Sequence, residues 1–499
     1  MTALDSMQGY VTDASYTSGF FRELSPAWLN YVAALNGVSP PRLDEPFRYL
    51  ELGCAFGSSV VTNAGAFPHA EFHACDFNPD HIAGARRHAD ALGIANIEFH
   101  ETSFHGLLAV DLPPFDFIVL HGVYSWVGAE ARESIRRLIE RKLRPGGLAY
   151  VSYNCQPGWA AEVPLRKLLM ELAATASGNS LERAQYALGF LSELSHGTLR
   201  YFSASPPAVA AVDSYRKSPI RYIVHEFLND TWEPFFSVDV AGDMAAIGAR
   251  FVGSATLADN HPQLVVDDQA AAAVARLDTE RQRRLAMDFA ANQRFRRDVF
   301  VADDSRHPPA DVARSLEAVA IGALGNPEHI GTKIAVPRGA VTFQAGFIRD
   351  LQTLMTRGSL TVGDAVRALT RRGTDAAAVT RNVMFLVAAG ALMPFARPYA
   401  RDESTVPGRP ANAIVERAIT HVTSHRAPVP IPSEVYGNGV PLTPTEALAI
   451  TEILGGAGTV DLLAARLEAG ELAPLDARRV ALDVFGSLIP TLMRLGVLV

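Results

Sequence analysis

The stretch at residues 47–57, FRYLELGCAFG, constrains the fold of this chain more than any other. Residues 47–52 form a short apolar run typical of a buried strand. The chain then turns through Gly53 and Gly57 into a segment with helical character, residues 58–67. A strand that breaks into a glycine-bearing loop and then a helix builds a ligand crevice at the strand ends of an α/β sheet. The sequence therefore predicts an α/β domain with a ligand site at this loop.

Two acids near the loop indicate which kind of ligand the crevice takes. A dinucleotide fingerprint reads G-x-G-x-x-G, but here Ala55 stands in place of the second glycine. Glu51 lies just before the loop, where a carboxylate suits a sulfonium and an amino-acid cation better than a phosphate. The next predicted strand, residues 70–75, runs into Asp76, and an acid in this place accepts hydrogen bonds from ribose hydroxyls.

This ordered set resembles the class I S-adenosylmethionine-dependent methyltransferases. The matching residues are the ELGCAFG motif at 51–57 and Asp76, followed by two further strands at suitable distances. The resemblance implies S-adenosylmethionine as cofactor and S-adenosylhomocysteine as product. The expected cofactor-binding residues are Tyr10, Glu51, Gly53, Cys54, Ala55, Phe56, Gly57, Asp76, Phe77, Thr102, Ser103, Phe104 and His121. The alternative is a glycine turn in an α/β domain that binds no ligand.

Residues 47–155 alternate between strand and helix patterns. The expected strands are 47–52, 70–75, 96–100, 115–121 and 147–153, with helices at 79–92 and 129–143. This rhythm predicts a mostly parallel, Rossmann-like sheet with helices on both faces. The segment before the first strand carries Tyr10 and Tyr16, and it either packs on the sheet or closes over the cofactor as a lid.

The fourth and fifth predicted strands run into HGVYSW at 121–126 and SYNCQPGW at 152–159. Both segments should project from the carboxyl edge of the sheet, where ligands bind. Methyl transfer needs positioning and exclusion of water, and aromatic faces stabilise a cationic amine or sulfonium. The expected catalytic or acceptor-site residues are Tyr153, Asn154, His121, Tyr124, Trp126, Trp159 and Tyr16. For His121, satisfying a backbone group is favoured over accepting a proton.

The segments HGVYSW and YNCQPGW also resemble a narrower bacterial group, methyltransferases that carry a methyltransferase regulatory domain. That group includes the rickettsial protein lysine methyltransferases that act on outer-membrane proteins. The resemblance implies three parts: a catalytic domain with its lid at 1–160, a mainly helical regulatory domain at 161–302, and a helical or winged-helix C-terminal region at 310–499, built as one domain or two related units. It also implies a homodimer.

The leading functional hypothesis is methylation of a protein lysine. A small-molecule N- or O-methyltransferase and a non-catalytic regulator that senses S-adenosylmethionine remain alternatives. Nucleic acid is not an expected partner, because the net charge is −8 and the candidate recognition helix at 375–390 is nearly uncharged.

No metal site is expected. His225 and Glu226 resemble half of one, but no second histidine follows at helical spacing. The three cysteines, Cys54, Cys75 and Cys155, form no CxxC pair. The N-terminus lacks signal-peptide features and the longest apolar run, 383–396, is too short to span a bilayer, so a soluble cytoplasmic protein is expected.

Overall fold

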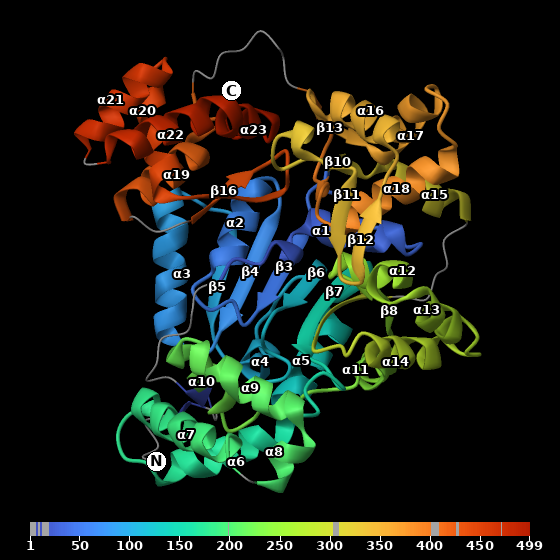
Figure 1. Ribbon diagram of the computed structural model, residues 1–499, viewed down its shortest axis with the longest axis vertical. Helices are drawn as coiled ribbons and strands as arrows, with labels where there is room; N and C mark the ends of the chain where they lie inside the picture. The colour runs from blue at the N-terminus through green and yellow to red at the C-terminus, as the bar shows by residue number, and fades with distance from the viewer. Residues whose placement is uncertain are drawn as a thin grey trace.

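A computed structural model describes residues 6–7, 10–11, 19–197, 199–302, 309–400, 409–425, 429–470 and 472–499. Figure 1 shows a central sheet with a helical group below it and two smaller units above it. None of the described helices combines the length and the apolarity that a membrane span requires.

The central sheet has seven strands in the order β5-β4-β3-β6-β7-β9-β8. Their bounds are β3 (Arg48–Leu52), β4 (Glu71–Asp76), β5 (Ile97–Glu101), β6 (Phe115–Leu120), β7 (Leu143–Asn154), β8 (Ala249–Ser254) and β9 (Phe295–Ala302). The first five strands in this order are parallel, which confirms the five predicted strands, and β9 and β8 add antiparallel partners at one edge.

The two antiparallel strands were not predicted, because β9 begins with charged residues that usually argue against a buried strand. Arg296 and Asp298 nevertheless lie buried on β9, and the Arg296 Nε donates to an Asp298 carboxylate oxygen at 2.9 Å. The region expected to be mainly helical thus also completes the sheet of the catalytic domain.

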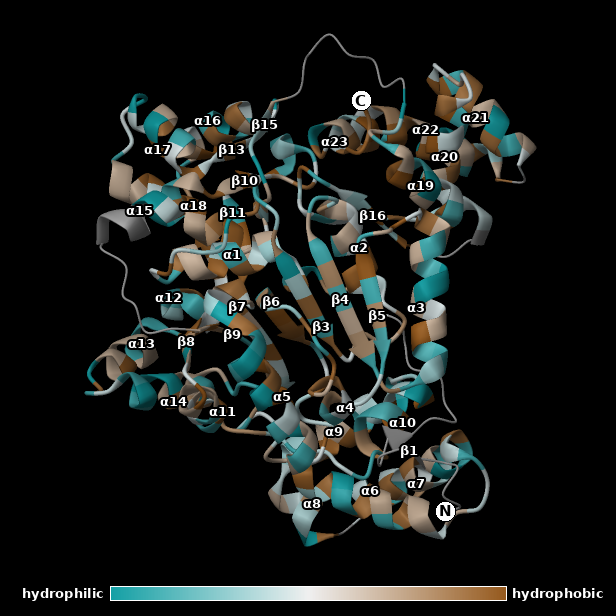
Figure 2. Ribbon diagram, turned by 180° about the vertical axis from the view of Figure 1, so that it is seen from behind, coloured by the Kyte–Doolittle hydropathy of each residue, from teal (hydrophilic) through white to brown (hydrophobic). Residues whose placement is uncertain are grey.

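Helices cover both faces of this sheet. One face packs against α1 (Pro26–Leu35), α2 (Ser58–Ala66) and α3 (Pro79–Leu92), and the other against α4 (Phe104–Leu107), α5 (Ala129–Lys142) and α11 (Ser237–Ala246). Helix α3 has the bounds expected from its sequence, because Asn78 caps it with Pro79 in the first turn and Gly93 ends it in the left-handed conformation. Figure 2 shows hydrophobic residues along β6 and a mixed surface on α3.

A helical group follows β7 and encloses an apolar core of its own, which includes Leu169, Leu191 and Phe227. Its helices are α6 (Val163–Thr175), α7 (Ser180–Ser195), α8 (Arg200–Ala204), α9 (Pro206–Lys217) and α10 (Ile220–Phe227). The chain enters and leaves this group at adjacent points, because the Gln156 N–H donates to the Phe235 carbonyl and the Phe235 N–H to the Asn154 carbonyl, both at 2.9 Å or less. Between β8 and β9 lie η2 (Leu257–Asn260), α12 (Pro262–Val265), α13 (Asp268–Ala275) and α14 (Glu280–Ala290).

The C-terminal region forms two units, each with several helices and short antiparallel strands (Figure 1). The first contains α15 (Pro309–Ala318), β10 (Ala320–Gly322), η3 (Pro327–His329), β11 (Lys333–Val336), β12 (Gly339–Thr342), α16 (Ala345–Met355), β13 (Gly358–Thr361), α17 (Val362–Thr370), α18 (Ala376–Ala388), β14 (Met393–Phe395) and β15 (Tyr399–Ala400). The second contains α19 (Ala413–His425), β16 (Val429–Ser433), β17 (Asn438–Leu442), α20 (Pro444–Leu454), α21 (Val460–Ala469), α22 (Pro474–Asp483), η4 (Val484–Leu488) and α23 (Ile489–Arg494). The winged-helix assignment and the domain boundaries remain predictions.

The N-terminal segment contributes the short antiparallel strands β1 (Ser6–Met7) and β2 (Tyr10–Val11), and η1 (Arg22–Leu24) before α1. The hairpin of β16 and β17 reaches η1 and α1: Ser25 Oγ donates to the Gly437 carbonyl at 2.5 Å, and Asn438 Nδ2 to the Arg22 carbonyl at 2.8 Å. The C-terminal region therefore packs directly on the segment that leads into the first strand.

Candidate active site

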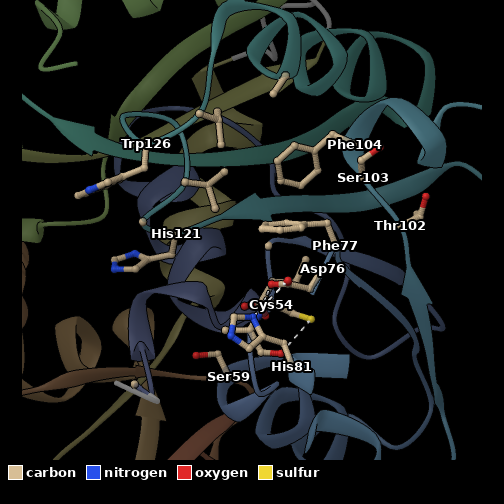
Figure 3. A pocket seen from close by; sticks show the side chains of 18 of the residues that line it. Cys54, Ser59, Asp76, Phe77, His81, Thr102, Ser103, Phe104, His121 and Trp126 are labelled. Carbon is tan, nitrogen blue, oxygen red and sulfur yellow. Dashed lines mark hydrogen bonds and ion pairs between the residues drawn. The ribbon is translucent and has the colours of Figure 1, made fainter. Parts of the chain in front are cut away.

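A cavity of about 1160 Å³, including its open mouth, lies at the carboxyl ends of β3, β4 and β6. The predicted cofactor residues that line it are Glu51, Gly53, Cys54, Ala55, Asp76, Phe77, Thr102, Ser103, Phe104 and His121. In Figure 3, Phe77 and Phe104 lie next to each other toward one end and His121 and Trp126 toward the other. The cavity therefore forms where the loop after β3 predicts a ligand crevice.

The glycine loop is held against the end of β4. The N–H groups of Gly53 and Cys54 donate to the Cys75 carbonyl at 2.8 and 3.0 Å. Gly53 has a φ of 76°, and a Cβ there would lie 2.6 Å from Val123 Cγ2, so both conformation and space require glycine. Ala55 adopts a φ of 47°, and its N–H donates to Asp76 Oδ2 at 2.9 Å. The loop thus keeps a glycine-like turn at the alanine that departs from the fingerprint.

Asp76 is buried at the end of β4 and holds both neighbouring turns. Asp76 Oδ2 accepts from the Ala55 N–H, as described above. Asp76 Oδ1 accepts from the Asn78 N–H at 2.9 Å, and His81 Nδ1 lies 3.2 Å from the same oxygen. Because a carboxylate has about four lone-pair sites, Asp76 retains capacity to accept from a ligand.

Glu51 is buried beneath the loop, and its Oε2 has no hydrogen-bond partner among the described residues. Burial, and next the nearby Asp76 carboxylate, raise the pKa of Glu51 to about 8. A buried carboxyl without a partner is costly, and a cation placed beside it would both satisfy the oxygen and favour the ionised form. This site therefore fits the positively charged end of S-adenosylmethionine.

His121 lies at the end of β6 in an aromatic setting. Its Nδ1 is 2.8 Å from the Tyr150 hydroxyl, and its ring centroid is 3.7 Å from that of Phe21. Burial, and next the positive charge of Arg297, lower the pKa of His121 to about 3, so the imidazole is neutral at physiological pH. The expectation that His121 satisfies a backbone group is wrong, since its partner is a side-chain hydroxyl.

Comparisons with known proteins agree with this geometry. A model described as "Methyltransferase domain" matches residues 43–191, and one described as "Predicted methyltransferase regulatory domain" matches residues 219–302. An uncharacterized protein of Synechocystis sp. is 33% identical over 357 residues, which cover 72% of this chain and 71% of that protein. The chain belongs to the S-adenosylmethionine-dependent methyltransferases with a methyltransferase regulatory domain.

More distant relatives of this methyltransferase include an uncharacterized protein of Rickettsia prowazekii, 27% identical over 299 residues, or 58% of this chain and 52% of that one. Among solved structures, PKMT2 from Rickettsia typhi has a TM-score of 0.70, or 0.72 in its complex with AdoHcy, at 17% identity. The match covers 97% of this chain and at least 99% of PKMT2, so the two proteins share their fold across all parts.

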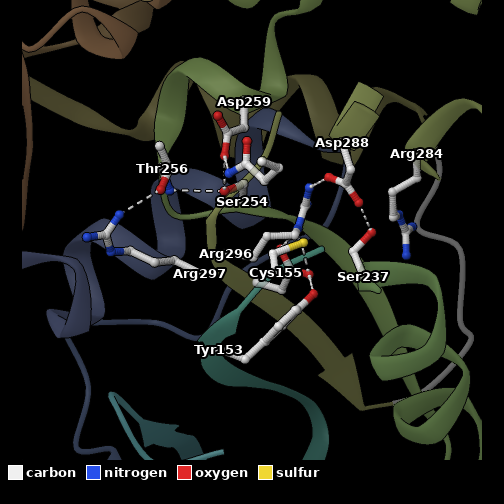
Figure 4. Close-up of polar contacts among 12 residues, drawn as sticks. Tyr153, Cys155, Ser237, Ser254, Thr256, Asp259, Arg284, Asp288, Arg296 and Arg297 are labelled. Atoms are coloured by element: carbon white, nitrogen blue, oxygen red, sulfur yellow. Dashed lines mark hydrogen bonds and ion pairs between the residues drawn. The ribbon is translucent and has the colours of Figure 1, made fainter. Parts of the chain in front are cut away.

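Several residues expected around the acceptor do not line the cavity of the methyltransferase. On a strand, successive side chains point to opposite faces. Tyr150 and Ser152 of β7 lie on the cavity side, whereas Tyr153 lies on the other side and is fully buried. Its hydroxyl donates to Asp298 Oδ2 at 2.5 Å, and Arg296 pairs with both Asp298 and Asp288 in the same buried network. Figure 4 shows Tyr153, Arg296 and Asp288 in this network.

The other predicted acceptor residues also have structural partners. Asn154 Nδ2 donates to Glu226 Oε1 at 3.0 Å, and the Trp159 Nε1 donates to the Arg294 carbonyl at 2.8 Å from within the helical core. The Tyr124 hydroxyl lies between Arg136 and Asp243. Tyr153, Asn154, Tyr124 and Trp159 are therefore corrected to residues outside the cavity wall, and only Trp126 and His121 of the described acceptor residues line it.

Two further predicted residues, Phe56 and Gly57, are not among the lining residues. Gly57 packs on Ala85, and the Phe56 ring lies 4.7 Å from that of the lining residue His81. The side chain of Tyr10 and all of Tyr16 lie outside the described residues.

Sequence reasoning missed Phe21, Ser59 and His81 as lining residues. The Phe21 N–H donates to Ser59 Oγ at 3.0 Å, which joins the segment before α1 to the first turn of α2. The signal for Phe21 was its place in the N-terminal segment, for which a lid over the cofactor was one of the two expectations. Ser59 and His81 carried only a weak one, their place in the first turn of the two helices that follow the strand ends.

Proposed function

We propose that this methyltransferase transfers methyl groups to the side-chain amine of a protein lysine. The observation that carries the proposal is the charge of the cavity wall. The described lining holds two acidic side chains, Glu51 and Asp76, and two histidines, His81 and His121, of which His121 is neutral, but neither lysine nor arginine. Such a wall favours a cationic cofactor and an amine acceptor over acceptors that carry a carboxylate or phosphate.

The fold shared with PKMT2 and the resemblance to rickettsial protein lysine methyltransferases support the same acceptor. A protein substrate and a homodimer follow as part of the proposal, together with a cytoplasmic location.

S-adenosylmethionine, when bound, supplies an electrophilic methyl group that a lone pair attacks in line. Glu51 would balance the positive charge of the cofactor, and Asp76 would hold the ribose while it orders the loop through Ala55. Phe21, His121 and Trp126 would form the wall that excludes water around the acceptor amine. Positioning and desolvation are the main contributions a protein makes to this reaction.

The acceptor amine must lose a proton before it attacks. A histidine whose pKa is about 3 is too weak a base to hold that proton near neutral pH. We therefore assign His121 a positioning role, and solvent takes the proton.

The proposal is tested by incubating the purified full-length protein with methyl-labelled S-adenosylmethionine and a lysate of its source organism. Hydrolysis of the acid-precipitated protein and amino-acid analysis should then reveal labelled methyllysine. Asp76→Ala should remove the label, whereas Glu101→Gln, which changes an exposed acid at the end of the neighbouring strand β5, should retain it.

Each other outcome selects a different function. Label confined to acid-soluble molecules would indicate a small-molecule methyltransferase. Binding of S-adenosylmethionine that depends on Asp76, without any labelled product, would indicate a cofactor-sensing regulator.

A further inference from the structure

The edge of the central sheet carries a cluster of metal-ligating side chains away from the cavity. Strand β5 is the edge strand, and it pairs in parallel with β4 so that His73 lies beside Glu98, and Cys75 beside His100. Because side chains alternate along a strand, His73, Glu98 and His100 all project from the same face. Of the three side chains, Glu98 is the one that faces solvent at the sheet edge.

The three side chains are close enough to share one ion. His73 Nδ1 lies 3.0 Å from His100 Nε2 and 3.8 Å from Glu98 Oε2, and one ligand atom from each residue lies within 4.8 Å of the others. Two imidazole nitrogens on a tetrahedral zinc ion are about 3.3 Å apart, given Zn–N bonds of about 2.0–2.1 Å. Small side-chain rotations therefore suffice to bring the three ligands onto one ion.

The surroundings of His73 orient it as a ligand. Its Nε2 lies 3.1 Å from Glu71 Oε1, and Glu71 is itself held by the Arg48 Nε at 2.6 Å. With a proton on Nε2 donated to this carboxylate, Nδ1 carries the lone pair that faces the cluster. A carboxylate that fixes the outer nitrogen of a ligating histidine is the usual outer-shell arrangement of zinc sites.

Burial and charge also favour ligation. The His73 side chain is 4% exposed and that of His100 10%, whereas Glu98 is 67% exposed and can reach the ion from solvent. The cluster thus offers two imidazoles that are largely shielded from solvent and one carboxylate that solvent reaches. The ring of Phe115 packs edge-on against His73 at 5.2 Å and limits its motion.

We propose that His73, Glu98 and His100 bind a borderline divalent transition-metal ion, with Zn²⁺ as the ion that fits best. Two nitrogens and one carboxylate oxygen match a zinc site with three protein ligands and a solvent molecule, whereas Mg²⁺ and Ca²⁺ require mainly oxygen ligands. The ion ties the edge strand β5 to β4. Because β5 leads into Thr102, Ser103 and Phe104, this tie stabilises one end of the cofactor cavity.

The test uses the full-length protein without an affinity tag, after treatment with chelator and exchange into metal-free buffer. Calorimetric titration with ZnCl₂ should show one equivalent bound, and MgCl₂ should show none. Glu98→Gln and His100→Gln should each weaken zinc binding by at least about tenfold, and Glu71→Gln by about tenfold. His105→Gln, which removes an exposed imidazole from α4, should bind zinc like the wild type.

An unchanged circular dichroism spectrum and a cooperative thermal unfolding transition check that Glu98→Gln and His100→Gln fold. A measurement independent of variants is zinc X-ray absorption on the wild type, which should show two imidazole nitrogens and one carboxylate among the ligands. The proposal is overturned if the wild type binds no stoichiometric zinc, if His100→Gln binds it with wild-type affinity, or if the spectrum shows only oxygen neighbours.

Discussion

The buried carboxyl of Glu51 lowers the stability of the cofactor-free protein when it ionises, yet its ionised form favours binding of the cationic cofactor. In the protein without cofactor, burial raises its pKa to about 8, far above that of an exposed carboxyl. Between about pH 4.5 and 8 the folded state therefore keeps a proton that the unfolded state releases. By linkage, this residue makes the free energy of unfolding fall as pH rises through that window, by at most about 1.4 kcal/mol per pH unit.

Replacing Glu51 with Gln removes this penalty. We expect Glu51→Gln to stabilise the cofactor-free protein relative to the wild type, by roughly 1–3 kcal/mol at pH 8 and by much less at pH 5. The same variant should bind S-adenosylmethionine more weakly, because the counter-charge is lost. Denaturant unfolding at both pH values and calorimetric binding measure the two effects. Glu101→Gln should change neither, and a wild type that is the more stable protein at pH 8 would contradict the idea.

The same ionisation should make cofactor binding depend on pH. Binding a cation favours ionised Glu51, so affinity should rise from pH 6 to about pH 8, by at most about tenfold per unit, and then level off. At pH 7 the protein should release a proton on binding, which calorimetry in two buffers of different ionisation enthalpy detects. Glu51→Gln serves as the comparison, and an equal pH dependence in that variant would assign the effect to another group.

Tyr153 gives a contrasting case, because its hydroxyl serves the buried network and not the cavity. Tyr153→Phe removes one hydrogen bond to Asp298 and leaves Arg296 to pair with that carboxylate. We expect a loss of stability of about 1–3 kcal/mol, since a charged acceptor loses a partner, with cofactor affinity unchanged. Thermal unfolding and calorimetric titration are the readouts. A variant with wild-type stability and no turnover would instead return Tyr153 to the acceptor site.

At the scale of elements, the turn after β3 depends on a glycine for two separate reasons. Gly53→Ala must adopt a left-handed backbone conformation and also collide with Val123. Gly146, at the start of β7, has the same φ of 76° but open space around its missing Cβ. Gly146→Ala therefore isolates the backbone cost, about 1–2 kcal/mol.

We expect Gly53→Ala to destabilise the protein by more than Gly146→Ala and to abolish measurable cofactor binding, which Gly146→Ala should retain. Adding Val123→Ala should recover part of the stability, because it removes the colliding methyl group. Equal losses in Gly53→Ala and Gly146→Ala would show that the collision has no effect.

The elements also show what the sequence could predict. The five parallel strands and α3 followed from apolar runs, a capping Asn-Pro and a closing glycine, which are all local signals. Because parallel strands end at one edge, Glu51 and Asp76 both line the crevice that the loop after the first strand predicted. Strand β9 was missed because its charged residues are buried only through their mutual pairing.

Two features of the candidate sites depend on how the strands pair and which face each side chain takes. A single sequence does not reveal this pairing. Tyr153 and Ser152 are neighbours in the chain, yet the alternation of β7 directs them to opposite faces. The proposed zinc ligands come from two strands, and no spacing along a single element links His73 to Glu98 and His100.

At the scale of the whole molecule, the C-terminal region is part of the catalytic unit. Its apolar residues join the same core as α1 and α2, and the β16–β17 hairpin holds the segment that supplies Phe21 to the cavity. No local pattern in the sequence indicated this contact, because it links residues about 400 positions apart.

We expect this contact between the hairpin and the N-terminal segment to affect the affinity for the cofactor. Asn438→Ala removes the hairpin's hydrogen bond to the Arg22 carbonyl, which then accepts only from the Ser25 N–H. We expect S-adenosylmethionine affinity to fall several-fold as the Phe21 segment loosens. Thr459→Ala, which removes the N-terminal cap of α21 elsewhere in the C-terminal region, should lower stability without lowering affinity. Calorimetric titration of both variants separates the two effects, and equal affinities would show that the hairpin only supports the fold.

The helical group α6–α10, unlike the C-terminal region, does not share the apolar core of α1 and α2. It encloses its own core. Its two ends lie side by side, because the Gln156 N–H donates to the Phe235 carbonyl and the Phe235 N–H donates to the Asn154 carbonyl at the end of β7. A chain segment with adjacent ends and a core of its own can be exchanged as a unit without breaking any strand of the sheet. Enzymes that keep the same cofactor-binding sheet can therefore carry different helical groups at this point.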